Sequence, residues 1–301
     1  MAAALLREAV ALYESGSLSS AREAAEDALH AADPHNDTLF AEGLLLLANV
    51  YCAAEDFAEA ERLAATCCCY VEEHLGPTHI GVATARLNRA VILLERYRLR
   101  SGNHDTTHTN TNTDSNSGNN GNNSNSGSSG LRLVEEAYAL LQTAARQLEN
   151  VDGVNRLLLA EVLHNTGVCC ELVGRHVDAL AAYMRSMQIR VHYTDASGVC
   201  DLKLALTMEH VAMLYRLLRG TKLQEAARLM DAVATTRRRY LGPRHPLFAA
   251  AILEQGVIAA ELGHKRRAVL LLQKALDIRR RLYGEEDPQT RCVAQLLAEV
   301  S

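Results

Sequence analysis

Apolar and small residues recur three or four positions apart over most of the chain, a spacing that predicts amphipathic α-helices. The helices are expected in pairs, because a small residue in one helix is followed 12 positions later by an Ala in the next. Four segments keep this separation, pairing Ala9 with Ala21, Ala48 with Ala60, Gly167 with Ala179, and Gly256 with Ala268. Small residues at these positions allow two antiparallel helices to approach closely, while larger flanking side chains fill the remaining space.

Two further segments vary this spacing. Ala212 is followed by Ala226 after 14 positions, because the break between the two helices is longer. Ala90 has its counterpart, Ala137, 47 positions later, with residues 101–130 between them.

The 101–130 insert is rich in Asn, Ser, Gly and Thr and contains no apolar residue. Such a segment cannot offset the entropy lost on ordering, so we expect it to be disordered. Without the insert, residues 81–98 and 131–149 form the expected antiparallel helix pair.

The pattern therefore predicts an all-α protein of about six antiparallel helix pairs, closed by a capping helix at residues 288–300. One pair cannot bury its own apolar face, so the pairs must stack into an α-solenoid. Residues 1–100 would hold the first two repeats and the first helix of the third. Residues 131–301 would hold the second helix of the third repeat, repeats four to six and the capping helix.

Two related stretches join successive repeats: "YLGPRHPLFAAA" at residues 240–251 and "HLGPTHIGVATA" at residues 74–85. Arg244 and His245, ahead of a helix N-terminus, could hold an anion. Alternatively, Gly242 and the flanking prolines end one helix and begin the next. We favour this second interpretation because the unit recurs where a repeat must end.

The recurring small positions and these junctions resemble tetratricopeptide repeats, and the resemblance extends over the chain outside the insert. The repeats of about 42 residues are similar to those of the kinesin light chain subclass. The segments that carry this likeness are "ATTRRRYLGPRHPLFAAAILEQG" (residues 234–256), "ALDIRRRLYGEEDPQT" (275–290) and "EEHLGPTHIGVATARLNRA" (72–90).

The resemblance implies a right-handed superhelix in which the first helices of the repeats line a concave, peptide-binding groove. The groove positions carried over from the family are Glu42, Asn49, Leu87, Val91, Glu161, His164, Val168, Glu171, Glu209, Met213, Arg216, Leu253 and Val257. The same face would include Leu45, Cys52, Thr84, Leu94, Leu206, Ala250 and Ala260.

This lining is mostly apolar, with acidic residues in the earlier repeats and no charge expected in the sixth. Chaperone-binding members of the family clamp a carboxylate at the positions of Leu45, Asn49, Leu87 and Val91, of which only Asn49 matches. The kinesin light chain groove is basic, unlike this one. We therefore predict a protein partner that supplies a basic or apolar peptide segment.

Charge and cysteine content further restrict the class of partner and the cellular compartment that we expect. The net charge is −5: residues 1–100 carry 8 basic and 15 acidic side chains, whereas residues 131–301 carry 23 and 19. This asymmetry is too mild and interspersed to favour nucleic acid. No apolar run approaches the roughly 18 residues that span a bilayer, and the N-terminus has no basic leader. The eight Cys form no CxxC pair, which favours a reducing, cytoplasmic compartment.

Arginine triplets at residues 237–239 and 279–281 fall near the ends of two second helices. They suit the C-terminal end of a helix dipole. Together with Arg244 and residues 265–267, they could instead form a basic edge for an acidic partner. The alternative function is therefore a kinesin light chain-like motor, cytoskeletal or ciliary assembly subunit that docks through a basic convex edge.

No residue pattern supports chemistry. Residues 67–69 are all Cys, but Cys67 occupies a position where other repeats have Ala or Ser, and no ligand set is complete. His104 and His108 are spaced like a helical metal pair inside a segment expected to form no helix. A phosphate loop, a nucleophile elbow and an HExxH motif are all absent from the sequence. We expect a non-enzymatic protein without a cofactor, a metal or a small-molecule substrate.

Overall fold

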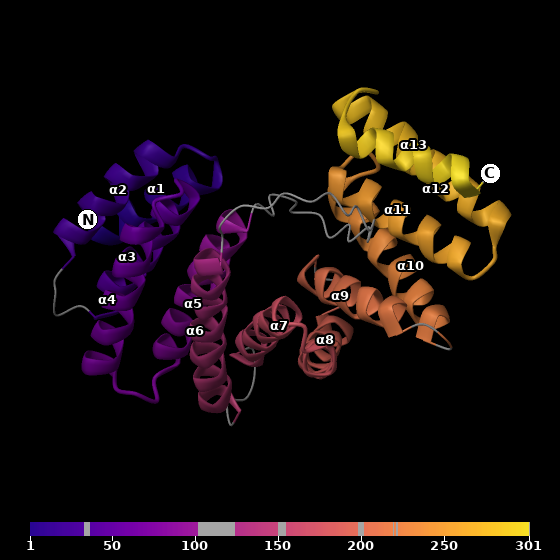
Figure 1. The fold of residues 1–301 in the computed structure, drawn as a ribbon. Helices are drawn as coiled ribbons and strands as arrows, with labels where there is room; N and C mark the ends of the chain where they lie inside the picture. The colour runs from indigo at the N-terminus through magenta and orange to yellow at the C-terminus, as the bar shows by residue number, and fades with distance from the viewer. Residues whose placement is uncertain are drawn as a thin grey trace. The chain divides into compact units, whose positions relative to one another are not determined.

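The computed structural model describes residues 1–32, 37–101, 124–149, 155–197, 202–218, 220 and 222–300, and these contain thirteen α-helices and no β-strand (Figure 1). The helices are α1 (Ala2–Glu14), α2 (Leu18–Ala31), α3 (Asp37–Ala53), α4 (Phe57–Leu75), α5 (Ile80–Arg100), α6 (Ser124–Leu148), α7 (Arg156–Leu172), α8 (His176–Ser197), α9 (Leu202–Leu218), α10 (Lys222–Leu241), α11 (Pro246–Glu261), α12 (Lys265–Tyr283) and α13 (Pro288–Val300). The predicted all-α fold and the capping helix at residues 288–300 are confirmed.

The helices belong to two compact units, the first ending at Ala179 and the second beginning at Leu180. In the first unit each helix from α1 to α7 packs against the next, and α1, α3, α5 and α7 also contact one another in sequence. The first helices of the repeats therefore form one layer and the second helices another. In the second unit, α9 to α13 pack in the same consecutive order. The fourth predicted pair, α7 and α8, falls on the boundary between the units.

The small residues lie at the helix contacts, as predicted. The paired residues Ala9, Ala21, Ala48 and Ala60 are all fully buried in the core of the first unit. A Cβ added at Gly256 of α11 would lie 2.9 Å from the Leu272 side chain of α12. Real Cβ atoms do not approach this closely, so an alanine at this position would have to displace the Leu272 side chain, and its Cβ would also lie 3.3 Å from the backbone nitrogen of Leu272.

The junction between α10 and α11 is structural, as we favoured. Gly242 has a φ of +88°, a left-handed conformation that glycine adopts without steric cost. Pro246 begins α11, and Nδ1 of His245 accepts a hydrogen bond of 3.1 Å from the backbone N–H of Leu247. His79 caps α5 in the same way, accepting from the N–H of Gly81 at 3.1 Å. The histidines of both junctions are therefore helix caps.

The helix predicted to begin at residue 131 begins earlier, at Ser124. Gly130 is buried, and a Cβ added there would lie 3.4 Å from the Tyr97 ring of α5. Once the later part of α6 is packed, each preceding residue adds one hydrogen bond for one fixed residue, so the helix extends into a polar stretch. The rest of the predicted insert, residues 102–123, lies outside the described residues, as do His104 and His108.

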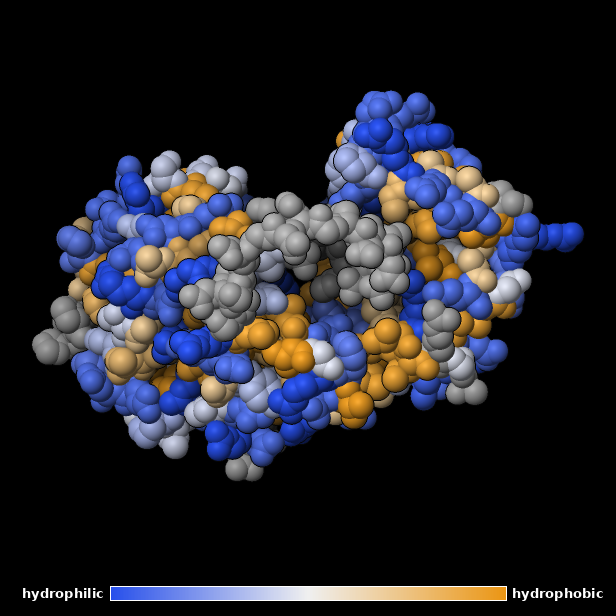
Figure 2. Space-filling view, in the orientation of Figure 1, coloured by the Kyte–Doolittle hydropathy of each residue, from blue (hydrophilic) through white to orange (hydrophobic). Residues whose placement is uncertain are grey.

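Figure 2 shows polar and charged residues over most of the visible surface of each unit, with smaller apolar areas between them. Among the described helices, none combines the length and the apolar content needed to cross a membrane.

Candidate interaction surface

The predicted groove residues divide into accessible and buried sets. Those that keep an accessible side chain are Glu42, Asn49, Val91, Glu161, His164, Glu171, Met213, Arg216 and Val257, together with Leu45, Cys52, Thr84, Leu206 and Ala260. In the first unit these residues come from α3, α5 and α7, which are neighbours in one layer. The structure therefore places the predicted positions of repeats two to four on adjacent helices of one layer.

Four of the predicted contact residues are in the core instead. Leu87, Val168, Glu209 and Leu253 are each at most 5% exposed, and Leu94 and Ala250 of the same face are also buried. Their side chains pack against neighbouring helices, so a peptide on this face would not reach them. Fewer apolar side chains are accessible at the predicted groove positions than the sequence predicts.

Glu209 is buried in an ion pair rather than displayed. Its two carboxylate oxygens accept hydrogen bonds of 2.8 and 2.6 Å from Arg237 of α10. Arg237 also donates to the carbonyl of Leu247, at the start of α11, at 3.1 Å. This two-point contact links α9, α10 and the next repeat, and the low-dielectric interior strengthens it.

Arg237 belongs to a position that is buried in every repeat. It lies 11 residues after the small residue of the second helix, as Arg190 and Arg279 do in the neighbouring repeats. All three arginines are 4% exposed. The same position in the first three repeats holds Ala32, Val71 and Leu148, which are also buried.

The first arginine of each triplet is consequently not part of a surface. Arg279 donates a hydrogen bond of 3.1 Å to the side-chain oxygen of Gln289 in α13, much as Arg237 reaches α11. Arg238, Arg239, Arg280 and Arg281 remain exposed. Both interpretations of the triplets, as residues that suit the C-terminal end of the helix dipole or as part of a basic edge, therefore apply at most to the second and third arginines.

The predicted basic edge is also divided in space. Arg280 and Arg281 lie at the C-terminal end of α12, whereas Lys265, Arg266 and Arg267 begin the same helix. At 1.5 Å per residue, Arg266 and Arg280 are about 21 Å apart along the helix axis. Arg267 is moreover paired with Asp231 of α10 at 2.8 Å.

Arg216 joins two carboxylates that the sequence analysis missed. It contacts Glu254 and Glu261 of α11, each at 3.0 Å. Glu254 is 3% exposed, and its burial raises its pKa to about 7, with Arg216 opposing the shift and Glu209 adding to it. The sixth repeat is therefore charged on this face. The two residues are seven apart, which places them on one side of the helix and is the signal that could have revealed them.

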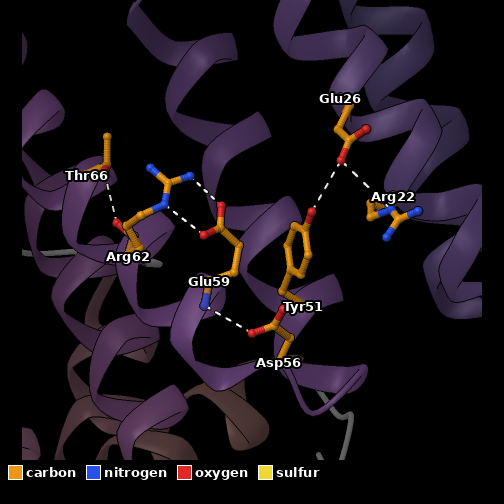
Figure 3. Close-up of polar contacts among 7 residues, drawn as sticks. All are labelled: Arg22, Glu26, Tyr51, Asp56, Glu59, Arg62 and Thr66. Atoms are coloured by element: carbon orange, nitrogen blue, oxygen red, sulfur yellow. Dashed lines mark hydrogen bonds and ion pairs between the residues drawn. The ribbon is translucent and has the colours of Figure 1, made fainter.

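A hollow of about 310 Å³ lies between α2 and the end of α3, away from the predicted positions. The Tyr51 hydroxyl on its wall donates to Glu26 at 3.4 Å, and Glu26 lies 3.9 Å from Arg22 (Figure 3). Asp56 accepts a hydrogen bond of 3.3 Å from the N–H of Glu59 and so caps α4. Partial burial and the nearby Glu26 raise the pKa of Tyr51, which keeps its hydroxyl a donor. These polar groups all have structural roles.

The Cys67–Cys69 run is mainly packing. Cys67 is buried, and its thiol donates to the carbonyl of Ala41 at 3.5 Å. Burial raises the pKa of Cys67 to about 12 and that of Cys68 to about 11, so both thiols remain protonated at neutral pH. Within the described ranges, no three His, Cys, Asp or Glu side chains are arranged as metal ligands would be.

The helix pairs also match known repeats. One family model described as a tetratricopeptide repeat matches residues 131–190, and a second with the same description matches residues 41–81, 204–247 and 249–289. The last three segments coincide with the pairs α3–α4, α9–α10 and α11–α12. A search of curated proteins gave no match.

Several solved structures are similar to the chain. A candidate kinesin light chain from Podosopora anserina, with nearly identical TPR-like repeats, has a TM-score of 0.56 and 16% identity over 83% of this chain and 98% of its own. A signal transduction ATPase with a tetratricopeptide repeat sensor, from Pyrococcus horikoshii, has a TM-score of 0.65 and 14% identity, and the match covers 99% of this chain and 38% of the ATPase. A Rap protein complexed with competence and sporulation factor has a TM-score of 0.57 and 12% identity, and the match covers 99% of this chain and 75% of the Rap protein. At these identities the likeness concerns the fold alone.

Proposed function

Because the chain belongs to the tetratricopeptide repeat proteins, we propose that it is a non-catalytic interaction scaffold that binds a peptide segment of a partner protein. The peptide would lie along the face formed by the first helices. The proposal is carried by one observation: although helix packing buries several apolar positions of this layer, such as Leu87 and Val168, the side chains of Glu42, Glu161 and Glu171 stay accessible on α3 and α7. Their carboxylates favour a partner segment that is basic or apolar.

Two further features support a peptide as the ligand. The helix α5, which contacts both α3 and α7, contributes the partly buried Val91, which offers apolar contact. In addition, the similar Rap structure was solved as a complex with competence and sporulation factor. The motor, cytoskeletal or ciliary role stays a prediction, since the likeness to a candidate kinesin light chain is one of fold.

The test reverses the accessible charge. A variant carrying Glu42→Lys, Glu161→Lys and Glu171→Lys is used beside wild type to capture partners from cell extract after cross-linking. Quantitative mass spectrometry then compares the captured proteins. We expect the partners enriched by wild type to fall about tenfold or more, because three attractive contacts become repulsive.

A matched control carries Glu23→Lys, Glu73→Lys and Glu135→Lys, at exposed positions on the second helices α2, α4 and α6. It makes the same change in net charge within the same unit, and it should retain the partners. Equal capture by both variants and wild type would show that the first-helix face is not the binding site. Glu209 is unsuitable for this test because it is a buried ion-pair partner.

A further inference from the structure

The second helices of the last two repeats end in the same way. Residues 237–242 of α10 read Arg-Arg-Arg-Tyr-Leu-Gly, and residues 279–284 of α12 read Arg-Arg-Arg-Leu-Tyr-Gly. Both helices pack against α11 and are joined to it by short turns, so they run parallel to each other. Their C-terminal ends therefore lie on the same side of the second unit, within about two helix diameters, or about 20 Å.

This side of the second unit carries unpaired positive charge. Arg238, Arg239, Arg244 and Arg281 are exposed, and none of the four has an ion-pair partner among the described residues. By contrast, Arg280 is 3.5 Å from Glu285. The segment from Thr235 to Leu247 contains no acidic residue, so the charge at the end of α10 is not neutralised by its own chain neighbours.

Apolar side chains are interleaved with these arginines. Tyr240 is 42% exposed, Leu282 38% and Tyr283 50%. The Arg239 guanidinium lies 5.8 Å from the centre of the Tyr240 ring, which holds the cation beside an aromatic face. Exposed Tyr and Arg side chains in one patch are the residue types that anchor protein interfaces.

We propose that this patch, defined by Arg238, Arg239, Tyr240, Arg244, Arg281, Leu282 and Tyr283 and termed the basic end, binds an acidic segment of a partner protein. Carboxylates of the segment pair with the arginines, and its apolar residues cover Tyr240, Leu282 and Tyr283. Complementary charge is the argument for this occupant. A nucleic acid is disfavoured because the chain has a net charge of −5 and the patch offers only four unpaired arginines.

The basic end does not depend on the proposed function, because its residues lie at the C-terminal ends of second helices and in the turn that follows α10. A partner could occupy it whether or not the first-helix face binds a peptide. The two proposals also require ligands of opposite charge, so their tests can fail separately.

The test measures binding of a fluorescein-labelled peptide, in which Glu alternates with Leu and Phe, by fluorescence anisotropy. The variant carries Arg238→Glu, Arg239→Glu and Arg244→Glu. We expect binding about tenfold or more weaker than wild type, and a wild-type affinity that falls as salt is added, because exposed charge pairs supply it.

The matched control carries Arg228→Glu, Lys265→Glu and Arg266→Glu, which are exposed, have no ion pair among the described residues and lie towards the opposite helix ends. It produces the same change in net charge and should bind as wild type does. Circular dichroism of both variants establishes that they fold. If both variants lost the same amount of peptide affinity, the loss would be due to the change in net charge alone, and the proposal would be wrong.

Two further measurements distinguish other occupants. If a fluorescein-labelled oligouridylate of similar length binds more tightly than the acidic peptide, the patch serves nucleic acid and the proposal is wrong. If sedimentation shows wild-type dimers that the Arg238→Glu, Arg239→Glu, Arg244→Glu variant does not form, the occupant is a second copy of the chain. Monomeric wild type with selective peptide binding is the expected result.

Discussion

At the scale of single residues, burial separates charged side chains that look alike in the sequence. Arg237 and Arg238 are neighbours, yet the first is 4% exposed and bound to Glu209, while the second is exposed. Glu254 and Glu261 share Arg216, but only Glu254 lies in the core. A buried carboxylate loses hydration that its partner restores only in part, which is why the pKa of Glu254 rises to about 7.

The raised pKa of Glu254 predicts a pH-dependent stability. Its folded-state pKa of about 7 exceeds the unfolded value of about 4.5, so the folded protein holds the proton more tightly. The stability that this group supplies is complete below about pH 4.5 and is lost as the pH rises to about 7. We expect the free energy of unfolding of wild type, relative to Glu254→Gln, to fall by about 3 kcal/mol over this range.

Urea unfolding of both proteins between about pH 5 and about pH 8 checks this expectation, because groups common to the two cancel in the difference. Glu261→Gln is the control: it removes the other carboxylate on Arg216 but leaves the buried one, so the pH-dependent fall should persist. A pH-independent difference between wild type and Glu254→Gln would contradict the shifted pKa.

At the scale of helices, small residues determine how closely the elements approach. The Cβ position of Gly256 is 2.9 Å from Leu272, whereas the matching positions of the second repeat hold Ala48 and Ala64, both fully buried. The separation of α11 and α12 is thus suited to glycine alone at this point. The early start of α6 has a different origin, because there a packed helix continues into Ser, Asn and Gly residues that do not favour a helix by themselves.

Gly256→Ala should therefore be destabilising even though Ala favours helix formation. The added methyl group must displace Leu272 or separate the helices, at a cost of about 1–3 kcal/mol. Chemical denaturation of Gly256→Ala, Leu272→Ala and the double variant forms a mutant cycle. We expect the double variant to lose less stability than the two single losses combined, because the shortened Leu272 relieves the clash. Additive losses would mean that the two side chains do not compete for space.

At the scale of the whole molecule, contacts are local along the chain. Within each unit a helix packs against its sequence neighbours, and in the first unit the first helices of adjacent repeats, α1, α3, α5 and α7, also contact one another. The buried arginines strengthen this arrangement, since Arg237 and Arg279 each bond to the next helix, α11 and α13 respectively. In such an array a destabilising substitution lowers the stability of its own and the neighbouring repeats most.

Arg237→Ala tests this locality. It leaves Glu209 buried without its cation, which costs about 3–5 kcal/mol. Hydrogen exchange followed by mass spectrometry should show faster exchange in α9 to α12 and little change in α1 to α4. Arg238→Ala, at the exposed neighbouring position, should exchange like wild type. An acceleration spread evenly over both units would instead indicate one cooperative structure.

Helix pairing and the capping helix followed from the sequence alone. Close packing needs a small residue wherever two helices meet, and the chain must turn wherever a pair ends, so both requirements leave local marks. The position 11 residues after the small residue of each second helix is apolar in three repeats, where it holds Ala32, Val71 and Leu148, but it holds arginine in the other three, so the sequence alone did not mark these arginines as buried.

Only the tertiary structure decided which charged residues form a surface. A helix turns by about 100° per residue, so one position separates an exposed side chain such as Arg238 from a buried one such as Arg237. Which of them is buried depends on helices from two repeats that the local pattern does not specify. For the same reason the sequence did not show that Glu209 is buried in an ion pair with Arg237, or that Glu254 and Glu261 contact the predicted groove residue Arg216.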